Sequence, residues 1–146
     1  MARAMARVAA MQLIFEHFAG GEGGMPTLQM IYDELRAEHP DGMTQSDPGM
    51  ADRARIERVL QGVIENQEEL DERIQAVSKN WRIERMAQVD LTILRLAAWE
   101  LLYETDVPGS VVINEAVEMA NTYASEGSGR FINGILGTIL RQRETP

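Results

Sequence analysis

The sequence predicts an all-α fold of six to seven helices, and three observations support this prediction. Apolar residues recur at spacings of three and four through most of the chain, which is the period of one buried helix face. Segments that contain glycine or proline interrupt this period and separate the predicted helices. No stretch of convincing length alternates apolar and polar residues, so no β-strand is predicted.

The first predicted helix runs from Ala2 to Phe18 and has one apolar face. The glycine-rich segment 20–24 ends it, because a glycine in a helix interior costs roughly 1 kcal/mol relative to alanine. A second helix is predicted to open at Pro26-Thr27 and to end at residues 39–42. A loop of about ten polar and glycine residues is expected to follow.

The middle of the chain predicts two further helical stretches. The first starts at residues 46–48, where a serine and an aspartate can cap a helix and Pro48 suits its first position. Its apolar stripe reaches Val77 and is predicted to break near Asn66. A short helical turn is then expected to begin at Asn80-Trp81.

Asp90 is predicted to cap a strongly apolar helix that extends through Leu102 and is buried on most of its circumference. A turn follows at residues 106–109. Residues 111–113 have strand propensity, but apolar residues from Ile113 onward keep a helical period, so a helix is predicted. Ser128 is the expected cap of the last helix.

Two glycines in this last helix, Gly134 and Gly137, lie about one turn apart. Because glycine has no side chain, a neighbouring helix is expected to approach closely at this point.

Length and composition restrict the class of protein. With 146 residues and 45% hydrophobic content, the chain forms one domain, or two very small ones, with a real core. A formal net charge of −9 excludes a protein that binds nucleic acid mainly by bulk charge, although residues 1–18 and 119–146 are mildly basic. The absence of cysteine excludes disulfides and Cys-ligated zinc. Without a membrane-length apolar run or a signal peptide, a soluble cytoplasmic protein is expected.

No catalytic constellation is recognisable in the sequence. His17 and His39 have no partner at metal-ligand spacing. The glycine-rich segment 127–134 has the wrong spacing for a phosphate loop and no strand before it. Carboxylates at Glu115 and Glu118, and the acidic run at 68–72, are typical of solvated helix faces. We therefore expect a binding protein rather than an enzyme, with no metal and no cofactor.

The C-terminal half contains four motifs that narrow this class further. They are Trp81–Arg85, Val89–Leu102, Asp106–Ala120 and Gly129–Leu136. Together with an opening helix of pattern R-x-x-A-x-Q-x-I-F at residues 7–15, they closely resemble the NusB family of transcription antitermination factors. The resemblance covers roughly residues 3–18 and 78–140, whereas residues 20–75 match only in helical pattern.

The resemblance implies a single NusB-like domain of two small packed helical bundles, approximately residues 1–77 and 78–146. It also implies a non-catalytic function. Together with NusE, a small-subunit ribosomal protein, the family binds the boxA element of nascent RNA and supports antitermination by the transcription elongation complex. Single-stranded RNA is recognised by stacking of splayed bases and by a few phosphate contacts, so an acidic protein can bind it.

The resemblance further implies which residues bind RNA. They are Arg3, Arg7, Gln12, Phe15, Asp90, Arg130 and Phe131. The arginines would contact phosphates, Phe131 would offer a stacking edge, and Asp90 would accept hydrogen bonds from base amino groups. Core packing is the preferred role of Phe15, since the usual tyrosine hydroxyl is missing. Glu84 would face the basic ribosomal protein.

Each of these residues also has an ordinary structural explanation as a solvated charge, a helix cap or a core aromatic. Asn121 stands where the family commonly has lysine, and only two arginines occupy the N-terminal basic stretch. Weak RNA binding by the chain alone is therefore expected, with affinity supplied by the protein partner.

Two alternative functions remain open from the sequence. Similar helical domains occur at the N-terminus of ribosomal RNA cytosine methyltransferases, so the chain could be a related RNA-binding module. It could instead be a purely structural interaction protein that forms a homodimer.

Overall fold

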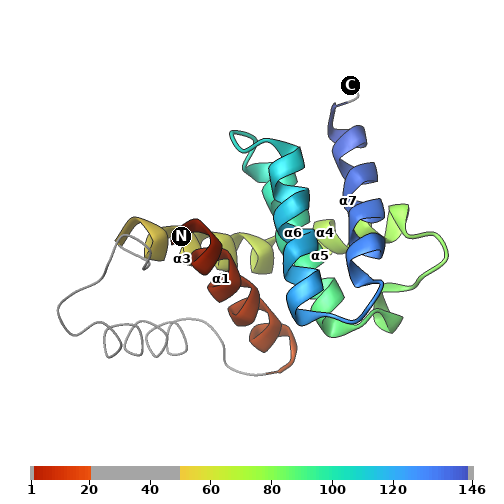
Figure 1. Cartoon of the computed structure of the whole chain (residues 1–146), viewed down its shortest axis with the longest axis horizontal. Coiled ribbons are helices and arrows are strands. Elements are labelled where there is room, and N and C mark those ends of the chain that lie inside the picture. Colours follow the sequence, from red (N-terminus) through yellow and green to blue (C-terminus); the bar gives the residue numbers. More distant parts are fainter. Residues whose placement is uncertain (1, 21–49, 145–146) are drawn as a thin grey trace. The chain divides into compact units, whose positions relative to one another are not determined.

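The computed structural model describes residues 2–20 and 50–144, with side chains for residues 6–20 and 54–143. These residues form six α-helices and one 3₁₀ turn. In chain order they are α1 (Ala2–Phe18), α3 (Met50–Glu65), α4 (Gln67–Val77), η1 (Ile83–Arg85), α5 (Gln88–Tyr103), α6 (Gly109–Tyr123) and α7 (Ser128–Glu144) (Figure 1). The described part of the chain contains no strand, which confirms the all-α prediction. None of its helices is both long and apolar enough to cross a membrane.

The chain divides into two compact units, Met1–Ile64 and Glu65–Pro146. The second unit contains α4, which packs against α5 and α7. The bundles implied by the resemblance, residues 1–77 and 78–146, would instead group α4 with the helices that precede it.

The first unit contains α1 and α3. The predicted helix from Ala2 to Phe18 is confirmed with the same bounds. Leu13 and Ile14 of α1 are completely buried, and so is Val63 of α3, in agreement with the apolar stripes of the two segments. The second predicted helix, the loop after it and the predicted restart at residues 46–48 lie outside the described residues.

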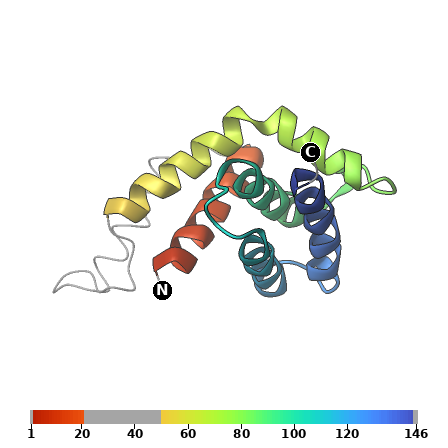
Figure 2. The same ribbon diagram turned by 90° about the horizontal axis from the view of Figure 1, so that it is seen from above.

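In the second unit α5, α6 and α7 pack against one another, and Figures 1 and 2 show α6 and α7 side by side. Every residue of α5 from Leu91 to Leu101 is buried, as the apolar composition predicted. Completely buried aliphatic side chains come from all four helices of the unit: Leu70, Ile74, Ile93, Leu94, Leu101, Val112, Ile132, Leu136 and Ile139. Burial of one such side chain stabilises the fold by about 1.5–3 kcal/mol.

Helices α4 and α5 are also joined by a charged pair. The Arg95 guanidinium donates two hydrogen bonds to the Asp71 carboxylate, Nε to Oδ1 at 2.8 Å and Nη2 to Oδ2 at 3.0 Å. The Arg95 side chain is only 7% exposed and that of Asp71 is 23% exposed. This two-bond geometry fixes the register of α4 along α5.

A second polar link lies on the surface between the same helices. The Tyr103 hydroxyl donates to Glu69 Oε2 at 2.9 Å. This hydrogen bond raises the pKa of Tyr103 above its ordinary value, because loss of the proton would place a second negative charge beside the carboxylate.

Several predicted boundaries are confirmed and others are wrong. Asn66 separates α3 from α4, as predicted, and α6 includes residues 111–113. The short helical turn begins at Ile83 rather than at Asn80-Trp81. Asp90 is not the cap of α5, because the extended residue Ala87 precedes the helix and the Leu91 N–H already bonds to the Ala87 carbonyl. The last helix begins at Ser128 itself.

The expected close approach at Gly134 and Gly137 is wrong. A Cβ at Gly134 would meet no atom within 4 Å, and one at Gly137 would meet only Arg141 of the same helix, at 3.6 Å. The tight approach between α6 and α7 occurs at Gly109, where an added Cβ would collide with Leu140. Spacing within one helix therefore did not reveal which glycine faces its neighbour.

We expect Asp71→Asn to lower the free energy of unfolding by about 2–3 kcal/mol, because the buried Arg95 guanidinium loses an ionised partner. Glu72→Gln, at an exposed position of the same helix, is the control and should change it by less than about 0.5 kcal/mol. Chemical denaturation measures both. Equal effects of the two substitutions would show that the pair contributes nothing.

Alanine substitutions at two glycines should change the stability of the protein in opposite directions. Gly127 has a φ of +90°, so Gly127→Ala should destabilise the protein by about 1–2 kcal/mol, although its Cβ would meet nothing. Gly134 lies inside α7 beside open space, so Gly134→Ala should stabilise it by about 0.5–1 kcal/mol. Thermal and chemical unfolding of the two variants test this contrast.

Candidate functional site

A hollow of about 390 Å³ opens on the second unit between the connection that precedes α5 and the start of α7. Its walls come from two segments that are far apart in sequence: Trp81, Arg85, Met86, Ala87 and Asp90 on one side, and Ser125, Glu126, Gly127, Ser128 and Phe131 on the other. Figure 1 shows the connection between α4 and α5, in green, passing beside the first turns of α7. The size is within the range of small-molecule sites.

The backbone around Trp81 is fixed by the end of α4. The Gln75 side-chain amide donates to the Trp81 carbonyl at 2.9 Å and accepts from the Ile83 N–H at 3.0 Å. The Ser78 hydroxyl donates to the Ile74 carbonyl at 2.8 Å and lies 3.3 Å from the Trp81 carbonyl. These bonds replace helical hydrogen bonds in a short connection, so Trp81 has a defined place at the rim.

Two aromatic rings line the hollow. The Trp81 side chain is 58% exposed, which is unusual for the largest apolar residue. Its ring lies 6.3 Å from that of Phe131, at an interplanar angle of 76°. In this edge-to-face arrangement one ring packs on the edge of the other, and the Trp81 ring stays accessible to a ligand.

Asp90 adds a carboxylate to the same hollow. It is the third residue of α5 and lies in the first turn of that helix. Its Oδ1 atom is buried, and no hydrogen-bond donor among the described residues reaches it. A buried acceptor without a donor is costly, so this atom is available to a donor supplied by a ligand.

The opposite wall is the start of α7. Gly127 adopts a left-handed φ of +90°, and the Phe131 N–H bonds to its carbonyl at 3.2 Å in the first turn of the helix. The N–H groups at a helix start favour anions, and α7 is long enough for its dipole to contribute.

Arg130, next to Phe131, lines a different groove of about 430 Å³ between α6 and α7. This second groove is polar, and its other lining residues are Asn114, Val117, Glu118, Asn121, Gly129 and Asn133. Consecutive residues of α7 therefore face two neighbouring depressions, one aromatic and one rich in amides.

The structure brings together only part of the predicted site. Asp90 and Phe131 line one hollow, with Arg130 in the adjacent groove. Glu84 is exposed on η1. Contact of any of these residues with RNA or protein stays a prediction.

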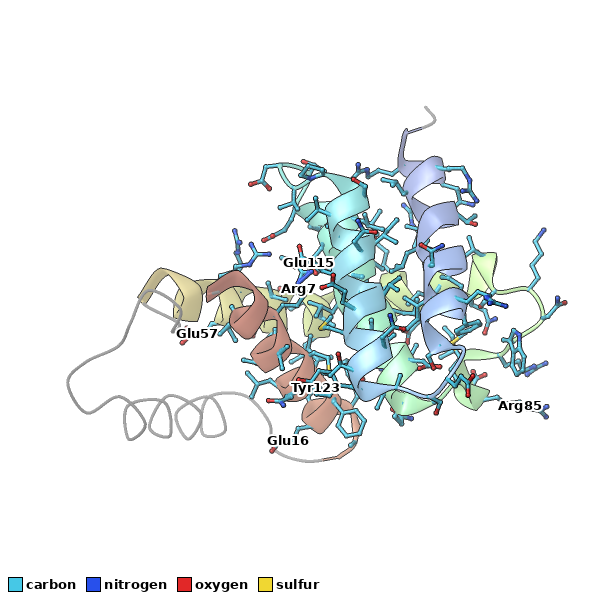
Figure 3. All side chains as sticks on the ribbon, in the orientation of Figure 1. Arg7, Glu16, Glu57, Arg85, Glu115 and Tyr123 are labelled. Atoms are coloured by element: carbon cyan, nitrogen blue, oxygen red, sulfur yellow. The ribbon has the colours of Figure 1, made fainter. Side chains whose placement is uncertain are left out.

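The remaining predicted residues lie on α1, in the first unit. Gln12 is exposed and Phe15 is half-buried. Arg7, labelled in Figure 3, is only 7% exposed. The Arg3 side chain lies outside the described residues. The RNA roles of these four residues also stay predictions.

Sequence reasoning missed Trp81 and Arg85 as lining residues. Arg85 projects outward at η1 (Figure 3), and Lys79 and Arg82 in the same connection are also exposed. Segment 79–85 has a net charge of +2 and contains a tryptophan, but the acidic run before it concealed this local excess. Summing the charge over windows shorter than a helix reveals this local excess.

No group of three or more histidine, aspartate or glutamate side chains that could bind a metal ion occurs among residues with described side chains. The hollow itself offers aromatic surface and the Asp90 Oδ1 atom, and its other charged lining residues are Arg85 and Glu126. Such a set can bind a planar ligand.

Comparisons with known proteins agree with the motifs. The model of the NusB family matches residues 4–141. A transcription antitermination protein NusB from Clostridium botulinum is 40% identical over 143 residues, covering 96% of this chain and all of that protein. The protein of the same name from Geobacter sulfurreducens is 42% identical over 140 residues, covering 94% and 93% of the two chains.

Solved structures show the same architecture. T. maritima NusB superposes with a TM-score of 0.78 at 31% identity, covering 97% of this chain and 92% of that one. A crystal structure of the antitermination factors NusB and NusE in complex with dsRNA matches with a TM-score of 0.68 at 23% identity, over 97% of both chains. On the evidence of the family model and of relatives matched along nearly their whole length, this chain belongs to the NusB family.

Proposed function

We propose that this protein is a non-catalytic transcription antitermination factor that binds boxA-type single-stranded RNA together with NusE and acts on the transcription elongation complex. Its relatives at about 40% identity are named as antitermination proteins. A structural neighbour of the same fold was crystallised with NusE and RNA. The observation on this chain that supports RNA binding is the aromatic hollow beside Arg130.

The chemistry of the second unit suits an unpaired strand. A base can stack on an aromatic ring only when it is not enclosed in a duplex, and Trp81 offers such a ring. Arg130 and Arg85 are exposed within or beside the two depressions, where they can contact phosphates.

The overall acidity favours a second, basic partner. With a net charge of −9, the protein gains little from non-specific attraction to RNA, whereas a basic ribosomal protein would be attracted to its surface. Glu84 is exposed on η1 and is our candidate for this contact. Part of the RNA affinity then comes from NusE.

We expect a labelled boxA-type strand to bind much more tightly when NusE is present, with a modest dependence on salt because few phosphates are contacted. Fluorescence anisotropy, with and without NusE and over a range of salt concentrations, measures both effects. A scrambled strand of equal length is the control. Equal affinity for the two strands, irrespective of NusE, would contradict the proposed function.

Arg130→Ala should weaken binding of the boxA strand by about three- to tenfold and reduce the salt slope by about 1, because one phosphate contact is lost. Arg141→Ala, near the opposite end of α7, is the matched control and should leave both unchanged. Neither substitution should shift the melting temperature by more than a few degrees, since both residues are exposed. Indistinguishable salt slopes for the two variants would remove Arg130 from the interface.

A further inference from the structure

We propose that Gln75 is a positioning residue, whose side-chain amide holds the connection between α4 and α5 in the shape that binds NusE and RNA. Gln75 thereby sets the rate at which the complex forms. The inference rests on the proposed function and adds a residue that belongs neither to the recognised motifs nor to the lining of the two depressions.

One side-chain amide pairs with two backbone groups of the connection. Gln75 Nε2 donates to the Trp81 carbonyl at 2.9 Å, and Gln75 Oε1 accepts from the Ile83 N–H at 3.0 Å. The residue between these two groups, Arg82, is extended. A glutamine amide offers the same donor and acceptor as a peptide group, so it binds this stretch as a neighbouring strand would. The two bonds together fix the direction of the backbone from Trp81 to Ile83.

The Gln75 bonds reach further along the chain than the turns of the connection do. The Trp81 N–H bonds to the Ser78 carbonyl at 3.0 Å, and the Met86 N–H bonds to the Ile83 carbonyl at 3.0 Å, so each of these bonds closes one local turn. The Gln75 bonds span six and eight residues and join the end of α4 to the start of η1. They therefore fix the two local turns relative to each other.

The connection presents many exposed side chains to a partner. Trp81 is exposed, and so are the charged residues Lys79, Arg82, Glu84 and Arg85. Such side chains add little burial that could order the backbone, so its order depends on hydrogen bonds. A segment that is ordered before binding loses less conformational entropy in the complex and binds more tightly.

Loss of the Gln75 amide has a specific kinetic consequence. The connection then has several conformations, and only a fraction of the free molecules is competent to bind. The apparent dissociation constant rises by the inverse of that fraction, and the association rate falls with it. The dissociation rate is little changed, because the partners hold the connection in the complex. Removal of a residue that contacts a partner mainly raises the dissociation rate instead.

Amide hydrogen exchange of the free protein, followed by NMR, tests the positioning step. We expect Gln75→Met, which removes both hydrogen bonds from a side chain of similar length, to raise the exchange rate of the Ile83 N–H at least about tenfold. The Ser78 N–H bonds to the Ile74 carbonyl and is the internal reference, whose rate should change by less than about twofold. Gln67→Met, at the opposite end of α4, is the matched control and should alter neither rate.

Binding kinetics on an immobilised boxA strand, with NusE present, test the consequence. We expect Gln75→Met to lower the association rate constant about three- to tenfold and to leave the dissociation rate constant within about twofold of wild type. Its melting temperature should stay within a few degrees of wild type, since Gln75 is only half-buried. Gln67→Met should match the wild type in all three measurements.

Three outcomes would overturn the inference. They are an unchanged Ile83 exchange rate in Gln75→Met, wild-type association kinetics in that variant, and an affinity loss that lies only in the dissociation rate. If boxA RNA with NusE binds the wild-type chain normally in those cases, the proposed function stands and only the role of Gln75 is rejected. Equal binding of boxA and scrambled strands by the wild type would instead reject the proposed function, and the exchange measurement still decides whether Gln75 orders the connection.

Discussion

Helix α5 is the element on which the second unit depends. Its central residues are buried on all sides, and α4, α6 and α7 all pack against it. Because a helix buried around its whole circumference cannot rotate without exposing apolar surface, the packing fixes both its axis and its register. The two hydrogen bonds between Arg95 and Asp71 then set where α4 lies along α5.

This rigidity positions the candidate site. Asp90 lies in the first turn of α5, directly beyond its buried stretch, so its place in the hollow is set by the core. The connection before it is short, and two hydrogen bonds of the Gln75 side chain hold it to α4. The opposite wall is the first turn of α7, whose later turns contribute Leu136 and Ile139 to the same core. A site on the ends of packed helices keeps its geometry without a ligand.

Charge acts on two scales in this protein. The total of −9 disfavours long-range attraction to nucleic acid. The connection 79–85 is nevertheless cationic, and screening over about 8–10 Å at physiological salt lets it act independently of distant acidic helices. The buried Oδ1 of Asp90 is a separate case, a carboxylate oxygen in a hollow that Arg85 and Glu126 also line. Buried acceptors without a donor are costly and are therefore uncommon away from functional sites.

The sequence by itself determined the helical class, most helix positions in the described chain and the family, because helical periodicity and ordered motifs are local properties of the chain. Helix starts such as that of α5 were misplaced, since they depend on backbone bonds that composition does not specify. Only the tertiary structure decided that Trp81 and Asp90 share a hollow with Phe131, and that Gly109 rather than Gly134 meets the neighbouring helix. These pairings join residues dozens of positions apart, and the packing of α7 against α5 and α6, not any local pattern, brings them together.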